Sequence, residues 1–94
     1  MKTATKWDAS VHLETEEGMA AYLNAALEDG DTSVIAAALG DIARARGMTQ
    51  LSKETGITRD GLYKALSPTG NPSFDTVQKV IKAFGLKLDV ATPA

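Results

Sequence analysis

Apolar residues recur every three or four positions along most of this 94-residue chain, which is the period of helices that bury one face. Between Met48 and Leu66 the pattern predicts two short helices joined by a tight turn at Gly56, because glycine adopts positive φ most easily. Thr58 has the residue type that caps the start of the second helix. The inward positions of this predicted helix-turn-helix are Leu51, Thr55, Ile57, Leu62 and Leu66.

Three more amphipathic helices are predicted, two before this motif and one after it. The first follows Thr15, an N-cap residue type, and ends at Gly30; the second runs from near Thr32 to Gly47; the last follows Ser73 and ends at Gly85. Their predicted buried stripes are, in order, Met19, Tyr22, Leu23, Ala26 and Leu27; Ile35, Ala38, Leu39 and Ile42; and Val77, Val80, Ile81 and Phe84. These helices predict an all-α fold.

The two ends of the chain follow a different pattern. Leu86, Leu88 and Val90 alternate with Lys87 and Asp89, which is the period of a β-strand. A strand needs a partner, so we expect it to pair with residues near 7–13 or with the same strand of a second copy, and we predict a homodimer. The expected divisions are an N-terminal arm over 1–14 with a short extended stretch, a helical domain over 15–85 and a C-terminal strand and tail over 86–94.

Composition limits the possible functions. The chain is 44% hydrophobic and 23% charged, has no cysteine, and shows neither a signal peptide nor a run of about 18 apolar residues, so we expect a single cytoplasmic domain. A lone His12, no glycine-rich phosphate loop and no paired carboxylates in an apolar setting argue against an enzyme. We expect no cofactor, no metal site and no membrane contact.

The charges are unevenly distributed, although the net charge is only −2. Residues 1–42 carry eight acidic residues against two lysines, whereas residues 43–66 carry five basic residues against two acidic ones. The positive segment coincides with the predicted helix-turn-helix, which fits nucleic-acid binding. The acidic segment is either a solvated face or a surface for a basic protein.

The exposed face of the second motif helix carries side chains suited to a DNA major groove. Arg59 could bind a guanine; Asp60 could accept from a cytosine or only favour the helix dipole; Tyr63 could contact a thymine methyl or a phosphate; and Lys64 also points toward the groove. Gly61 inside a helix suggests close approach of the backbone to a base or phosphate. Expected contacts to the DNA backbone are Thr49, Gln50, Lys53, Thr58, Thr69 and Asn71.

Two parts of this interpretation stay open. The same pattern would also suit an ordinary helical hairpin without DNA. Arg44 and Arg46, in the last turn of the second predicted helix, could either complement the helix dipole or contact phosphates.

The runs 40–51, 61–68 and 70–74 resemble the addiction-module antidote family, small antitoxins similar to the HigA-like group with a helix-turn-helix of the phage-repressor (Cro/C1, XRE) type. The resemblance extends from about Trp7 to Val90. It implies a five-helix, lambda-repressor-like DNA-binding domain that represses its own operon at a palindromic operator and binds a RelE- or HigB-like toxin, a small basic protein. The alternatives are a stand-alone phage-type regulator without a toxin and a protein-binding helical adaptor.

Overall fold

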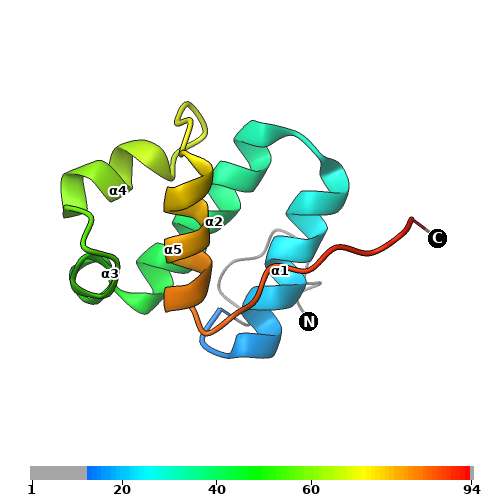
Figure 1. Ribbon diagram of the computed structural model, residues 1–94, viewed down its shortest axis with the longest axis horizontal. Coiled ribbons are helices and arrows are strands. Elements are labelled where there is room, and N and C mark those ends of the chain that lie inside the picture. The colour runs from blue at the N-terminus through cyan, green and yellow to red at the C-terminus, as the bar shows by residue number, and fades with distance from the viewer. Residues whose placement is uncertain (1–12, 94) are drawn as a thin grey trace, which may run out of the picture.

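The computed structural model describes residues 13–93 and contains five helices (Figure 1). They are α1 (Glu16–Asp29), α2 (Thr32–Arg46), α3 (Met48–Thr55), α4 (Arg59–Ala65) and α5 (Phe74–Ala83). Helix α1 packs on α2, α2 also contacts α3 and α4, and α5 packs against α3. Figure 1 shows α1 and the α3–α4 pair at opposite sides of the molecule, with α5 between them. The predicted all-α class and the number of helices are confirmed for this part of the chain.

Side-chain caps fix where four of the helices begin. The Oγ1 atoms of Thr15 and Thr58 accept from the Gly18 and Gly61 amides at 3.0 Å, and Ser73 Oγ accepts from Thr76 N at 3.1 Å. These three caps were predicted from the sequence. Asp31, to which the sequence analysis gave no role as a cap, is the N-cap of α2 and accepts from Ser33 N at 2.9 Å.

The predicted stripes meet in one core, which is centred on α2. Ile42, Leu62 and Val80 are fully buried, and Leu13, just before α1, is 4% exposed. Ile35 and Val77 are only partly buried at the edge of this core. Leu27 was predicted to be buried, but 45% of it is exposed, because it lies in the last turn of α1 next to the end of the helix.

Helix α5 ends in a Schellman motif that determines where the C-terminal segment goes. Gly85 has φ +80°, Gly85 N donates to Lys82 O at 3.0 Å, and Leu86 N donates to Ile81 O at 3.1 Å. Leu86 packs against the edge of the core. The chain then leaves α5 as an extended tail that crosses α1 (Figure 1).

The predicted β-strand over residues 86–90 is not present: the tail has no strand assignment, and there is no strand elsewhere in residues 13–93. The prediction was wrong for the single chain because a strand exists only where its backbone pairs, and no described segment lies alongside the tail to pair with it. Trp7, Val11 and His12, assigned to an N-terminal arm, lie outside the described residues.

Candidate nucleic-acid interface

The turn between α3 and α4 is fixed by hydrogen bonds within the motif. Gly56 has φ +76° and its amide donates to Ser52 O at 2.9 Å. Ser52 Oγ donates to Ile57 O at 2.6 Å, so this small side chain joins the end of α3 to the turn. Thr55 Oγ1 donates to Leu51 O at 2.8 Å and accepts from Ile57 N at 3.2 Å. The angle between the two helices is therefore held by local bonds.

Helix α4 is attached to the body of the protein by one apolar edge. Leu62 and Leu66 are 0% and 1% exposed, as the sequence predicted. Behind them, α2 presents Gly40, where a Cβ atom would overlap the backbone carbonyl of Leu66. This close contact leaves the opposite face of α4 free to meet a ligand.

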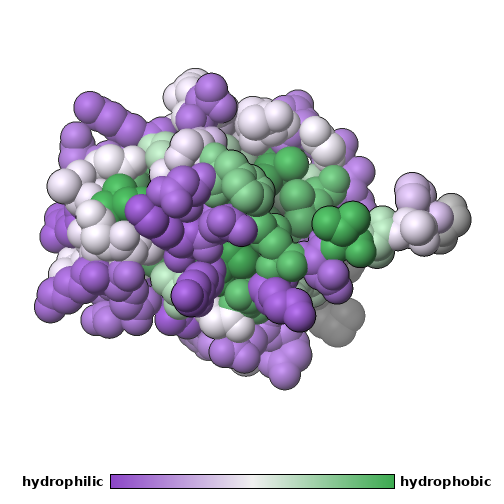
Figure 2. All heavy atoms as spheres, viewed as in Figure 1, coloured by the Kyte–Doolittle hydropathy of each residue, from purple (hydrophilic) through white to green (hydrophobic). Residues whose placement is uncertain are grey.

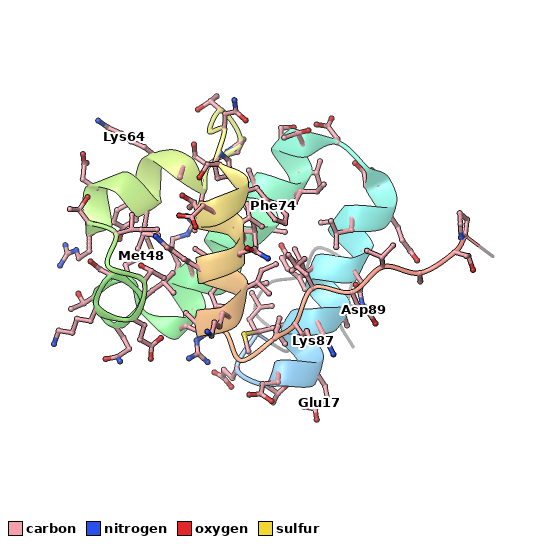
Figure 3. All side chains as sticks on the ribbon, viewed as in Figure 1. Glu17, Met48, Lys64, Phe74, Lys87 and Asp89 are labelled. Carbon is pink, nitrogen blue, oxygen red and sulfur yellow. The ribbon has the colours of Figure 1, made fainter. Side chains whose placement is uncertain are left out.

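The exposed face of α3 and α4 carries linked polar side chains. Arg59 Nη1 donates to Thr49 Oγ1 at 3.2 Å, which connects the start of α4 to the start of α3. Lys64 Nζ lies 3.5 Å from Asp60 Oδ2 within α4. Lys64 extends outward from the protein (Figure 3), and Tyr63 is 47% exposed.

The sequence-predicted contact residues thus lie on one region of connected elements. Thr49, Gln50 and Lys53 lie on α3, and Gln50 Nε2 donates to Glu54 Oε2 at 3.1 Å. Thr58 caps α4, which carries Arg59, Asp60, Gly61, Tyr63 and Lys64, and Thr69 and Asn71 lie in the following loop. Gly61 is half-buried and the others are exposed. A direct bond between two of them, Thr49 and Arg59, was not foreseen.

The loop after α4 returns closely onto the end of that helix. Gly70 N donates to Ser67 O at 2.8 Å, and Ser67 Oγ donates to Lys64 O at 3.1 Å. A Cβ atom at Gly70 would overlap the carbonyls of Lys64 and Ala65. The loop is therefore compact, and it keeps Thr69 close to the C-terminal end of α4.

The glycine inside α4 has a packing reason within the protein. A Cβ atom at Gly61 would lie 3.1 Å from Thr58 Oγ1 and 3.3 Å from Ile57 Cγ2. Both distances are tight, so a glycine here leaves room for the N-cap and the turn. Close approach to DNA is not needed to account for it.

The two arginines at the end of α2 are engaged within the protein. Arg44 Nη2 lies 2.7 Å from Asp41 Oδ1, and Asp41 Oδ2 accepts from the Tyr22 hydroxyl at 2.6 Å. Arg46 Nη2 donates to Ala83 O at 3.2 Å, at the end of α5. The sequence analysis missed the role of Asp41. Its spacing to Arg44 could have indicated an ion pair, but the bond from Tyr22 depends on how α1 packs on α2.

No group of three or more histidine, cysteine, aspartate or glutamate side chains in the described residues 13–93 could hold a metal ion. No helix within that range is long and apolar enough to cross a membrane.

Comparison with known proteins places the chain in a family. Residues 3–92 match a family model described as "Probable addiction module antidote protein". An uncharacterized protein of Haemophilus influenzae is 52% identical over 84 residues, which cover 89% of this chain and 87% of the relative. No solved structure matches the chain. The family description implies a toxin partner and a regulatory role. From residue 3 to residue 92, this chain is a member of the addiction-module antidote family.

Proposed function

We propose that this antitoxin is a sequence-specific DNA-binding repressor that reads a palindromic operator with α4 and also binds a RelE- or HigB-like toxin. The proposal gives α3 and α4 the roles of the two helices of a Cro/C1-type helix-turn-helix. The observation that carries it is the exposed face of α3 and α4, on which Lys53, Arg59 and Lys64 outnumber the carboxylates of Glu54 and Asp60. The turn at Gly56 fixes the relative position of these two helices.

Arg59 is the residue best placed to read a base. Its position in the first turn of α4 matches the part of a recognition helix that reaches base edges in the major groove. The bond to Thr49 restricts where the guanidinium can point, which lowers the entropy lost when two parallel hydrogen bonds form to a guanine. Lys64 and Tyr63 would lie further along the same groove, and Asp60 would tune the position of Lys64 through their ion pair.

The DNA backbone would meet the start of α3 and the loop after α4. Gly47 offers no side-chain cap to α3, so the first amides of this helix lack a side-chain acceptor there. Thr49 and Gln50 carry two of these amides, and Lys53 lies one turn further along α3. Thr69 and Asn71 extend from the loop that follows α4. Contacts of this kind hold the register of the protein on DNA without reading sequence.

The toxin would be bound elsewhere on the molecule. Acidic side chains are exposed at both ends of α1, with Glu16 and Glu17 in its first turn and Glu28 and Asp29 in its last. A small basic toxin would complement this charge. The DNA face, on α3 and α4, would then stay accessible when the toxin is bound.

The direct test is a binding titration with the DNA upstream of the gene and with a scrambled duplex of the same length, each at two salt concentrations. We expect tight binding to the upstream DNA, weaker binding to the scrambled duplex, and a loss of affinity for both as salt increases. Equal and weak binding to both duplexes would reject the repressor proposal and favour a helical adaptor that acts through protein contacts alone.

Arg59→Ala tests the proposed base contact. We expect it to reduce the free energy of binding to the preferred site by about 1–3 kcal/mol and to relax specificity at one base pair. Equal weakening on every duplex would instead show that Arg59 contacts phosphate. Lys79→Ala is the matched control, because it removes one positive charge from α5, where Lys79 pairs with Asp75 at 3.0 Å, outside the proposed interface.

A regulator without a toxin differs from this proposal only in its partner. Co-expression of the chain with the product of the adjacent reading frame, followed by purification of one protein and a test for the other, separates the two. An adjacent product that is toxic alone and forms a stable complex with this chain supports the antitoxin role. An adjacent product that neither inhibits growth nor binds favours the stand-alone regulator.

A further inference from the structure

Beyond Leu86, the backbone of the C-terminal tail, residues 86–90, pairs with no other segment of residues 13–93. Leu86 is anchored by the Schellman motif and by the edge of the core, but no backbone hydrogen bond joins residues 87–90 to another described segment. The tail is nevertheless extended, and it carries exposed apolar side chains: Leu88 is 38% exposed and Val90 96% exposed. Within the tail, the Val90 amide donates to Asp89 Oδ1 at 2.9 Å, a bond that a partner strand would replace. An exposed apolar segment whose backbone pairs with no other described segment is a template for strand pairing.

The tail is complementary to itself when two copies run antiparallel about Leu88. In that register Leu88 lies opposite the partner's Leu88, Leu86 opposite the partner's Val90, and Lys87 opposite the partner's Asp89. Each copy supplies one lysine and one aspartate, so both charged pairs are of opposite sign. We propose that residues 86–90 of two copies form a two-stranded antiparallel ribbon, with its two-fold axis at Leu88, and that this ribbon joins the homodimer.

The two faces of the ribbon differ in polarity, as the alternation of apolar and charged residues in the tail requires. Side chains of directly opposed residues point to the same face, so Leu86, Leu88 and Val90 of both copies form one apolar face, and Lys87 and Asp89 form the other. In this arrangement Val90 lies beside the partner's Leu86, which is anchored to the core. The ribbon thus accounts for an apolar side chain that is almost fully exposed in the single chain.

The surface around the tail has room for a second strand. A hollow of about 590 Å³ lies between the tail and α5, lined in part by Gln78, Lys82 and Leu88. Another, of about 370 Å³, lies between the tail and α1, lined in part by Leu23, Leu27 and Leu88. Apolar residues gather around this part of the molecule on the face shown in Figure 2, and Figure 3 shows Lys87 and Asp89 along the tail over α1. An isolated two-stranded ribbon is marginal in water, so backing by these helices matters.

This inference rests on the palindromic operator in the proposed function, which calls for a two-fold dimer, and it gives the contact between the two copies a location. A two-fold axis through the tails would relate two α4 helices, as a palindromic operator requires. The ribbon leaves α3 and α4 free, so dimer formation and DNA binding can be measured separately.

The test reverses the charges one at a time and then together. Lys87→Asp places aspartate opposite aspartate twice, and Asp89→Lys places lysine opposite lysine twice. By sedimentation equilibrium we expect each single variant to raise the dimer dissociation constant about tenfold or more, because both symmetric pairs change from attraction to repulsion. The double variant restores opposite charges and should return to the wild-type value. Glu28→Lys, with the same charge change as Asp89→Lys on the exposed end of α1, should leave the dissociation constant unchanged.

Mixing the two single variants gives a second test, because misfolding of either variant could not produce the result that we expect from it. Lys87→Asp opposite Asp89→Lys makes both charged pairs favourable, so native mass spectrometry should show heterodimers in excess of either homodimer. A wild-type chain that stays monomeric, or a dimer unaffected by these changes, would overturn the ribbon. A dimer that behaves as expected but binds no DNA would reject the proposed function and leave the ribbon standing.

Discussion

Gly40 illustrates how a single missing side chain positions the candidate DNA interface. It is buried in α2, and the space that a Cβ atom would need is occupied by the backbone carbonyl of Leu66 at the end of α4. Backbone atoms cannot move aside as the end of a flexible side chain can. The depth at which α4 sits on the protein therefore depends on this glycine.

Gly40→Ala should destabilise the protein despite the better helix propensity of alanine. The propensity gain is about 1 kcal/mol. Overpacking against a backbone carbonyl costs typically about 1–3 kcal/mol and displaces α4. We therefore expect a lower free energy of unfolding in urea and weaker operator binding. Ala45→Ser is the control, because it adds one heavy atom on the exposed side of the same helix. An unchanged or increased stability of Gly40→Ala would show that α4 shifts without cost.

At the scale of a single helix, Asp31 determines where α2 begins. Its Oδ1 accepts from the hydroxyl and the amide of Ser33, at 2.8 and 2.9 Å. The hydroxyl first, and then the amide, lower the pKa of this carboxyl below its ordinary value. Since the folded-state pKa is the lower one, the cap stabilises the fold above the unfolded-state pKa, and this contribution is lost as the pH falls through the folded-state pKa.

Asp31→Asn separates the charge of this cap from its hydrogen bonds. Asparagine caps helices about as well as aspartate but does not titrate. We expect the stability difference between wild type and variant to be more favourable to wild type at neutral pH than at about pH 3, which lies below the ordinary pKa of aspartate. Urea unfolding at both pH values measures the difference. A difference that stays constant with pH would mean that the charge of Asp31 does not contribute.

The helices were predictable because their signals are local. Thr15, Thr58 and Ser73 cap helices as expected, and Gly47, Gly56 and Gly85 mark ends that the structure confirms. The strand over 86–90 was not predictable in the same way, because a strand depends on a partner that no local pattern contains. The period-two alternation was real, but in a single chain it gives an extended tail.

The candidate interface was predictable in its residues but not in its contacts. The exposure of Arg59, Tyr63 and Lys64 follows from helical periodicity once Leu62 and Leu66 face inward. The bond from Arg59 to Thr49 depends on the angle between two helices, and the bond from Tyr22 to Asp41 depends on packing between α1 and α2. Sequence spacing determines neither the angle between α3 and α4 nor the packing of α1 on α2. The packing reason for Gly61 was missed although Thr58 and Ile57 are close to it in sequence, because the conformation of the turn determines how near their side chains come.

At the scale of the whole molecule, charge is divided between two ends. Residues 43–66, which include α3 and α4, are net positive, and the acidic residues are concentrated in residues 1–42. A net charge of −2 would repel DNA if it were spread evenly. In the proposed complex this separation would let the α3–α4 face meet phosphates while the acidic end points away, so it would select the orientation of approach along with the affinity.

This division predicts how individual lysines affect the salt dependence of DNA binding. Each phosphate neutralised by a side chain contributes close to one unit to the slope of log K against log salt concentration. Lys53→Ala should therefore reduce that slope by about 1 and weaken binding to all duplexes to a similar degree. Lys79→Ala changes the net charge equally but acts from α5, so its slope should stay close to that of wild type. Equal reductions would mean that DNA responds to the overall field of the protein, whereas a difference confined to Lys53 would identify α3 as a helix that touches the DNA backbone.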